Sequence, residues 1–277
     1  MKILLSNSVF FKSLRHFNDI GFVPTMGGIH KGHLSLINKS NKLCKKTIVS
    51  IFINPKQFNS KKDLKNYPKN IKKDLTILNK GNKVDFVYLP KFKDIYKNNK
   101  KSKINLNKKD KILCAKYRKG HFEGVLDVMN KLTKIINPQK IFMGEKDFQQ
   151  LYLVKKQLER IYKTKVIRCK TIRDRNNIAL SSRNFLLKKH NLIIAAKIYK
   201  KLVSIKKNIK NKKNIKNKKN IRSFLNLQKK ELKNNYKIKI DYLELRNINN
   251  LKISTTKKNS KLFIAYYLNN VRLIDNL

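Results

Sequence analysis

The chain has 277 residues, 40% of them hydrophobic, which excludes an intrinsically disordered protein despite a formal net charge of +52. Three separated cysteines with no Cys-x-x-Cys pair exclude a disulfide scaffold and a zinc ribbon. No apolar run approaches the roughly 20 residues that a membrane-spanning helix needs, and the N-terminal run is too short for a signal peptide. We therefore expect a cytoplasmic protein with a sizeable core and no membrane partner.

Lysine supplies nearly all of the positive charge and is spread along the whole chain, whereas arginine is rare. Reading bases takes clustered arginines or aromatic side chains on which bases stack, and the sequence shows no such cluster. We interpret the charge as a compositional bias of solvated surfaces and expect no specific nucleic-acid partner. A nucleic-acid-binding module remains the alternative from another functional class, and nonspecific binding to polyanions should fade with salt.

The N-terminal part alternates short runs rich in Val and Ile with helical patterns. The predicted strands are 21–23, 48–53, 84–89, 141–143 and 166–172. The predicted helices are 31–44, 68–80, 124–136 and 147–162. This alternation is typical of an α/β, Rossmann-like doubly wound parallel sheet, in which ligands bind beyond the carboxyl ends of the strands.

The composition changes after about residue 184. The elements predicted there are helices over 186–206 and 221–234 and strands over 237–245 and 262–268. Between the helices, the Lys, Asn and Ile tract at 207–220 is interpreted as a surface loop or a frayed helix. We therefore expect two domains, residues 1–174 and a smaller C-terminal α+β domain at 175–277 that closes over the first as a lid.

The first predicted strand leads into Val-Pro-Thr-Met-Gly-Gly-Ile-His-Lys-Gly-His at 23–33. Glycines let backbone N–H groups approach a ligand, and the first turn of a helix offers unpaired donors to an anion. His30 and His33 are three positions apart, so on a helical turn both rings project to one side, where they can donate to phosphate oxygens. The stretch predicts a phosphate site. Taken alone, it also fits a turn with two solvated histidines.

Four more polar stretches come at or just beyond predicted strand ends. They are Gln57 after Asn54-Pro55, Arg118 in Arg-Lys-Gly-His-Phe-Glu-Gly, the Gly144–Gln150 turn, and Ser181-Ser182-Arg183. An amide binds hydroxyls or a carboxylate, and guanidinium groups, lysines and hydroxyls suit carboxylate or phosphate oxygens. Either serine of the last stretch also fits a simple helix N-cap. Since the chain has no Walker loop, these stretches predict a nucleoside-triphosphate site of another kind.

A His-x-Gly-His pair on such a sheet is typical of a nucleotidyltransferase superfamily, and within it the sequence resembles the pantothenate synthetase (pantoate beta-alanine ligase) family. The similar blocks, in matching order, are 24–33, 50–58, 120–125, 142–151, 180–184 and 271–276. A different nucleotidyltransferase of the same fold is the competing enzyme. It would explain the histidines, but not Gln57, Gln150 and the Gly144 block together.

The resemblance implies ATP-dependent condensation of (R)-pantoate with beta-alanine to pantothenate, AMP and pyrophosphate through a pantoyl adenylate. The implied catalytic residues are His33, His30 and Lys146, with His33 as the proton donor of the family. The implied ATP contacts are Met26, Gly27, Gly28, Ile29, His30, Lys31, Gly32, His33, Gly144, Glu145, Lys146, Asp147, Ile172, Leu180, Ser181, Ser182 and Arg183. Gln57 is implied to bind pantoate and beta-alanine, Gln150 pantoate, and Arg118 to lie nearby.

The resemblance further implies Mg2+ held mainly by the phosphate oxygens of ATP, with Asp74 as a candidate protein ligand, and a homodimer. Three departures from the family pattern concern turn rigidity and metal support. Asn176-Asn177 stands where Asp-Gly is common, Lys119 where proline is common, and Lys73 where an acidic residue can occur. Asparagine tolerates left-handed backbone angles, so we expect the turn before Ser181 to survive.

Overall fold

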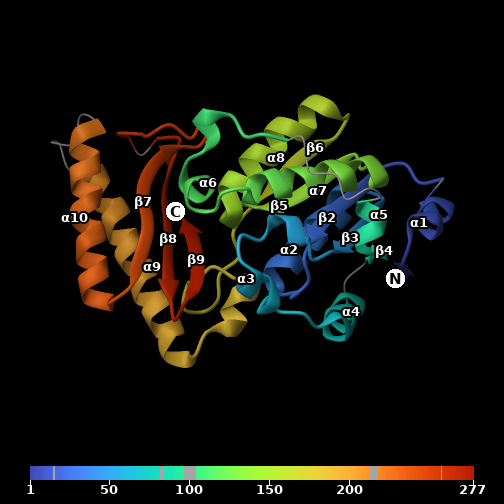
Figure 1. Ribbon diagram of the computed structural model, residues 1–277, viewed down its shortest axis with the longest axis horizontal. Helices are drawn as coiled ribbons and strands as arrows, with labels where there is room; N and C mark the ends of the chain where they lie inside the picture. Colours follow the sequence, from blue (N-terminus) through green and yellow to red (C-terminus); the bar gives the residue numbers. More distant parts are fainter. Residues whose placement is uncertain (15, 82–83, 97–103, 212–217, 257) are drawn as a thin grey trace. The chain divides into compact units, whose positions relative to one another are not determined.

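The computed structural model of the protein describes residues 1–277 apart from 15, 82–83, 97–103, 212–217 and 257. The chain forms two compact units, Met1–Ile172 and Arg173–Leu277 (Figure 1). A six-stranded parallel sheet lies in the first and a three-stranded antiparallel sheet in the second, which confirms the predicted fold class. The units separate at Ile172, and the expected domain division after residue 174 stays a prediction.

The sheet of the first unit has the order β1-β4-β3-β2-β5-β6, and the paired strands are parallel. The strands are β1 (Lys2–Leu4), β2 (Ile20–Thr25), β3 (Lys46–Ile51), β4 (Phe86–Tyr88), β5 (Lys140–Gly144) and β6 (Lys165–Cys169). The five strands predicted from the sequence correspond to β2–β6. β1 was not predicted, because a three-residue strand at the edge of a sheet, with two exposed residues, carries almost no periodic signal.

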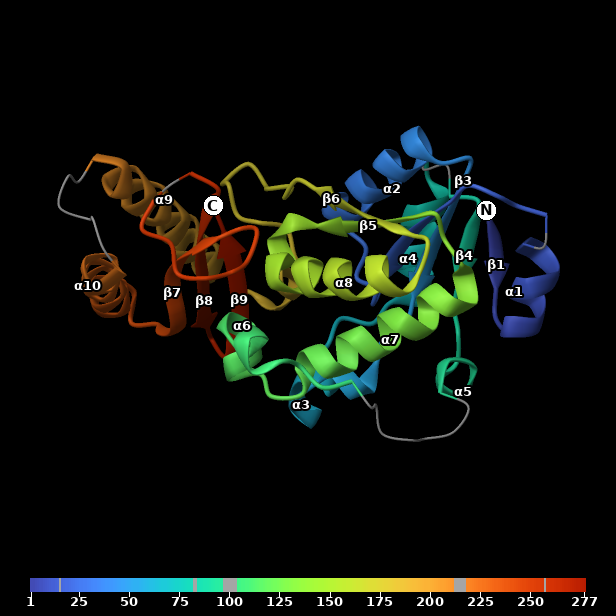
Figure 2. The ribbon, with the colours of Figure 1, turned by 90° about the horizontal axis from the view of Figure 1, so that it is seen from above.

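Helices cover both faces of this sheet, with α2 on one side and α7 and α8 on the other (Figure 2). The helices of this unit are α1 (Asn7–Leu14), α2 (Lys31–Leu43), α3 (Lys61–Lys65), α4 (Ile71–Asn79), α5 (Phe92–Ile95), α6 (Leu113–Tyr117), α7 (His121–Ile136) and α8 (Phe148–Ile161). The 3-10 turns are η1 (Pro55–Gln57), η2 (Lys108–Asp110) and η3 (Glu145–Asp147). Helix α7 begins three residues before the predicted start, because Gly120 adopts a left-handed φ of +77° as its N-cap.

The core under α2 and α4 is built from strand residues that carry the predicted apolar runs. Val23, Val49 and Phe142 are fully buried there, together with Ile37 of α2 and Leu78 of α4. Side chains from a central parallel strand are covered on both faces, which is why these runs are apolar throughout rather than alternating. The packed core holds the carboxyl ends of β2, β3 and β5 in fixed register.

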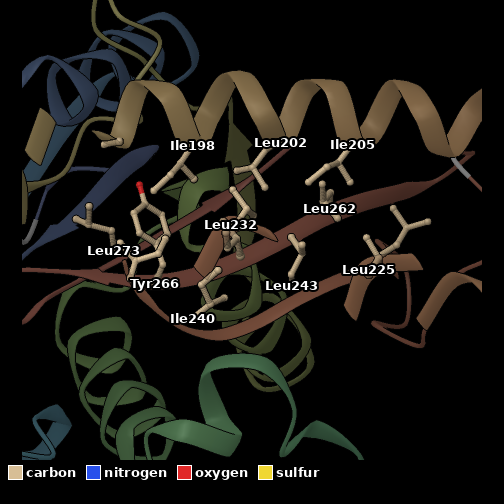
Figure 3. Packing of buried hydrophobic residues seen from close by; sticks show 14 of the residues in the cluster. Ile198, Leu202, Ile205, Leu225, Leu232, Ile240, Leu243, Leu262, Tyr266 and Leu273 are labelled. Atoms are coloured by element: carbon tan, nitrogen blue, oxygen red, sulfur yellow. The ribbon is translucent and has the colours of Figure 1, made fainter. Parts of the chain in front are cut away.

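The second unit packs two long helices on its antiparallel sheet. Its elements are η4 (Ser182–Leu186), α9 (Lys189–Asn211), α10 (Lys218–Tyr236), β7 (Lys239–Asn247), β8 (Ser260–Leu268) and β9 (Val271–Asn276). Ile198, Leu202 and Ile205 of α9 point onto the sheet, where they meet Leu262 and Tyr266 (Figure 3). The predicted tract at 207–220 ends α9 and begins α10, and its middle lies outside the described residues.

Strand β9 was not predicted, although the Asn-Asn pair before it is typical of a tight hairpin turn. Asn269 and Asn270 both take left-handed φ angles, +45° and +64°, and join β8 to β9 in a two-residue hairpin. Asn is one of the few side chains that tolerates this conformation, which tight hairpins require. The Arg173 guanidinium then pairs with both carboxylate oxygens of Asp275 on β9, at 2.7 and 2.9 Å.

Candidate active site

Three of the predicted polar stretches follow neighbouring strands at one edge of the parallel sheet. Met26–His30 follows β2, Asn54–Gln57 follows β3, and Glu145–Asp147 follows β5. β2 lies between β3 and β5, and the chain order reverses direction across it. In open parallel sheets, ligands bind at this reversal beyond the carboxyl ends of the strands. The fold therefore brings three of the predicted stretches to one edge of the sheet.

The two histidines cap the start of α2 reciprocally. The backbone N–H of Gly32 donates to Nδ1 of His30 at 3.1 Å, and the backbone N–H of His30 donates to Nδ1 of His33 at 3.3 Å. A ring nitrogen that accepts a hydrogen bond carries no proton, so each neutral ring is protonated at Nε2. The ring centroids are 4.1 Å apart. The pair therefore presents two neighbouring Nε2–H donors.

Both histidines are neutral at physiological pH. Burial and, to a smaller extent, the nearby Lys146 ammonium together lower the pKa of His30 to about 4. Burial, followed by the neighbouring His30 and Lys146, lowers the pKa of His33 to about 3. The rings thus act as hydrogen-bond donors without a charge of their own. The role of His33 as a proton donor stays a prediction.

The glycine turn before the histidines directs its N–H groups inward. Gly27 and Gly28 have φ angles of +83° and +63°, which only glycine adopts freely. The N–H of Gly27 donates to Oγ1 of Thr25 at 3.2 Å, and the next two N–H groups donate to the Asp74 carboxylate at 2.9 and 2.8 Å. We had expected glycine N–H groups to approach the phosphate. In this structure they are bonded within the chain, and side chains are the available donors.

Gln57 is held in one orientation by Asn54, a fully buried residue that the sequence indicated only as the end of a strand. The side-chain oxygen of Asn54, Oδ1, accepts the backbone N–H of Lys56 at 3.2 Å. Its side-chain nitrogen, Nδ2, therefore donates to Gln57 Oε1 at 3.2 Å and to the backbone oxygen of Gly124 at 3.1 Å. Gln57 therefore turns Nε2, its donor, toward Met26 Sδ at 2.8 Å. The signal for Asn54 was a polar residue directly after an apolar strand, before a proline.

Arg118 and Gln57 are joined through His121, which sequence reasoning missed. The Arg118 guanidinium donates from Nη1 to Nε2 of His121 at 2.9 Å, since it has no lone pair to accept with. His121 must then carry its proton on Nδ1, from which it donates to the Gln57 carbonyl at 2.7 Å. Asp63 lies 3.7 Å from Nη2 of Arg118. Two predicted substrate residues thus form one connected unit.

The turn after β5 brings Lys146 to the histidines. Its Nζ lies 3.1 Å from Asp147, and Glu145 pairs with Arg168 at 2.9 Å. Of the two glutamines that follow, Gln149 is buried and bonded to the backbone of the 110–115 segment. Gln150 is only partly buried, and its contact with pantoate stays a prediction.

The remaining predicted ATP contacts, Leu180 and Ser181-Ser182-Arg183, belong to the second unit, and their contact with ATP stays a prediction, as does that of Ile172. Ser181 caps η4, and its Oγ accepts the N–H of Arg183 at 3.3 Å. The turn before it is formed as expected, because Asn177 takes a φ of +63° and Asp174 Oδ1 accepts two N–H groups, at 2.9 and 2.8 Å.

Asp74, the predicted protein ligand for Mg2+, is bonded to the backbone of the glycine turn. Within the described part of the chain, no three His, Cys, Asp or Glu side chains are grouped to hold a metal ion. Both Asp74 oxygens accept backbone N–H groups. Asp74 as a metal ligand stays a prediction.

None of the helices in the described part of the chain is long and apolar enough to span a bilayer.

The sequence matches the model of the pantoate-beta-alanine ligase family over residues 5–277. The chain belongs to this family. Its curated relatives include the pantothenate synthetases of Flavobacterium psychrophilum, 37% identical over 95% of this chain and 93% of the relative, and of Endomicrobium trichonymphae, 38% identical over 100% and 97%.

Solved structures of pantothenate synthetases have the same fold as this member of the pantoate-beta-alanine ligase family. The Thermus thermophilus protein superposes with a TM-score of 0.89 at 26% identity, covering 100% of this chain and 99% of its own. The Francisella tularensis ligase superposes with a TM-score of 0.81 at 35% identity, covering 100% and 97%, and was solved in complex with beta-gamma ATP and beta-alanine. The similarity extends through both units.

Proposed function

We propose that this site condenses (R)-pantoate with beta-alanine at the expense of ATP, giving pantothenate, AMP and pyrophosphate. The observation that carries the proposal is the meeting, at one sheet edge, of the neutral donors His30 and His33 with the Lys146 cation and the joined pair Gln57 and Arg118. The first group suits phosphates and the second suits a hydroxy acid and an amino acid. The chain is thus an AMP-forming, amide-forming ligase.

The chemistry has two steps. A carboxylate reacts poorly with an amine because its oxygen is a poor leaving group. A pantoate oxygen therefore attacks the α-phosphorus, the bond to the β-phosphate oxygen breaks, and pyrophosphate leaves with its electron pair. The amine of beta-alanine then attacks the acyl carbon, the bond to AMP breaks, and the amine releases its proton. Lys146 and the two Nε2–H groups would stabilise the charge that grows on the phosphates.

The proposed substrate contacts use the polar side chains that this network orients. Gln57 offers Nε2 to a pantoate hydroxyl or carboxylate, and Gln150 lies on the first turn of α8. Gln57 would also reach beta-alanine, and Arg118, joined to Gln57 through His121, would lie near the substrate carboxylates. The second unit would contribute Ser181, Ser182 and Arg183 to the triphosphate and exclude water from the adenylate when it closes.

We further propose that the enzyme works on ATP complexed with Mg2+, in the cytoplasm, as a homodimer, without a nucleic-acid partner. The first point is supported by His30, His33 and Lys146, whose N–H groups suit the phosphate oxygens of such a complex. Analytical ultracentrifugation across a range of concentrations tests the dimer, and a single monomeric species at all of them would contradict it.

The decisive experiment is exchange of labelled pyrophosphate into ATP with pantoate present and beta-alanine absent. We expect exchange that requires both pantoate and Mg2+. Without beta-alanine the adenylate cannot react further, so it reacts with labelled pyrophosphate and re-forms ATP. Exchange that ignores pantoate but needs another acceptor would identify a different nucleotidyltransferase. No exchange with any acceptor by folded protein would exclude the adenylate mechanism.

Replacing Lys146 or His33 by Ala should lower the exchange rate by about 10²-fold or more, because each removes a donor to transition-state charge. His190→Ala is the matched control, because this exposed histidine lies in the first turn of α9 in the second unit. It should exchange at the wild-type rate. A loss below about threefold for both Lys146→Ala and His33→Ala would reject their proposed roles.

A further inference from the structure

The turn after β2 has the geometry of an anion-binding hollow. Gly27 and Gly28 both have positive φ angles, and the N–H groups of Gly28 and Ile29 point to the same side, where one carboxylate accepts both. Successive N–H groups arranged in this way form a concavity that binds anions in many phosphate sites. In a phosphate site built from this turn, the hollow would be open to the substrate.

Here the hollow is filled by the protein itself. Asp74, on α4, places Oδ2 at 2.9 Å from the Gly28 nitrogen and Oδ1 at 2.8 Å from the Ile29 nitrogen. The residue is 3% exposed. Among the described residues it forms no ion pair, so the two backbone N–H groups are what balances its buried charge. A buried carboxylate needs such partners.

The fit is too close for a chance contact. A Cβ added to Gly27 would lie 2.8 Å from Asp74 Oδ2 and 3.3 Å from a methyl group of Ile51, so glycine is required for the carboxylate to reach the turn. Asn70 caps α4 by accepting the N–H of Lys73, which fixes the helix turn that carries Asp74. The next residue after the anchored Ile29 is His30.

We propose that Asp74 is a positioning residue for the phosphate site. Its carboxylate occupies the hollow as an internal anion, fixes the direction in which the chain enters His30, and leaves the triphosphate to the histidines and Lys146. The catalytic consequence rests on the proposed function, whereas the anchoring of the turn does not. Without this carboxylate, the hollow is vacant and accepts a small anion from solution.

The anchor is tested directly by hydrogen exchange of the Gly28 and Ile29 amides in the ligand-free protein. In Asp74→Ala and Asp74→Asn, both amides should exchange about tenfold faster or more, because each loses a charged acceptor. The amides of Phe22 and Val23 in β2 report that the fold is intact. Asp94→Asn is the matched control, since this carboxylate accepts the Lys91 N–H at 2.8 Å on α5, outside the site. Unchanged protection of Gly28 and Ile29 would overturn the proposal.

The functional consequence is tested by chemical rescue of pantoate-dependent exchange. We expect kcat to fall about tenfold or more in Asp74→Ala, since displaced donors lose alignment, and added formate to restore it with saturation. Formate should not affect wild type or Asp94→Asn. The Mg2+ concentration for half-maximal rate at saturating ATP should be that of wild type. No rescue, or a raised Mg2+ requirement, would overturn the positioning role. Failure of the wild type to exchange would instead refute the proposed function and leave the amide result standing.

Discussion

Gly124 is the point at which α7 approaches the loop that carries Gln57 most closely. A Cβ added there would lie 2.3 Å from the carbonyl oxygen of Lys56, 2.7 Å from its carbonyl carbon and 2.9 Å from the Cα of Gln57. These are backbone atoms, so no rotamer change relieves the contact. Gly124→Ala therefore tests whether α7 positions Gln57.

The magnitude follows from opposing effects. Alanine in a helix interior gains about 1 kcal/mol over glycine, whereas overpacking costs about 1–3 kcal/mol. The free energy of unfolding should therefore fall by no more than about 2 kcal/mol. To reach ordinary contact distance, the Lys56 backbone must move by roughly 1 Å, and Gln57 moves with it. A misplacement of this size costs about 10²-fold in rate.

Pantoate-dependent pyrophosphate exchange and urea unfolding together separate the two effects. The expected result for Gly124→Ala is a large loss of exchange with a small loss of stability. Gly81→Ala is the matched control, because Gly81 has a φ of +74° and open space around the added Cβ. It should lose about 1–2 kcal/mol from left-handed strain and keep its exchange rate. Exchange by Gly124→Ala within about threefold of wild type would refute the positioning of Gln57 by α7.

Three further predictions concern pH, stability and charge. Burial lowers the pKa of His30 to about 4 and of His33 to about 3, so below pH 6.5 the unfolded chain binds protons that the folded chain does not. The free energy of unfolding should therefore decrease as the pH is lowered from about 6.5 to 4, by up to about 1.4 kcal/mol per pH unit per histidine. If the free energy of unfolding of His33→Gln depended on pH as steeply as that of wild type, this explanation would be contradicted. Arg173→Ala leaves the buried Asp275 carboxylate unpaired and should cost about 3–5 kcal/mol in urea unfolding, whereas a loss below about 1 kcal/mol would show that the pair is dispensable. Binding to duplex DNA should weaken steeply between about 50 and 200 mM salt, and binding that persists would contradict the interpretation of the lysines as a surface bias.

Much of the site was predictable because its residues are close in sequence. The glycine turn, the two histidines and the Gly144–Gln150 stretch each lie within one turn between a strand and a helix, and local chemistry identified them. Asn54 and His121 were missed. Each acts through a partner on another element, Asn54 through Gly124 and His121 through the Gln57 carbonyl, and no local pattern indicates such pairs.

The sequence by itself determined the alternation of strands and helices, and with it the parallel sheet, the edge at which ligands bind and the family. Apolar periodicity and motif order are properties of residues close in sequence, so they can be recognised without the tertiary structure. Only the tertiary structure decided which nitrogen of each histidine carries the proton, and that the glycine turn holds Asp74 rather than presenting its N–H groups outward. A hydrogen bond depends on the direction of both groups, and residues 28 and 74 acquire that direction only when α4 packs against the sheet.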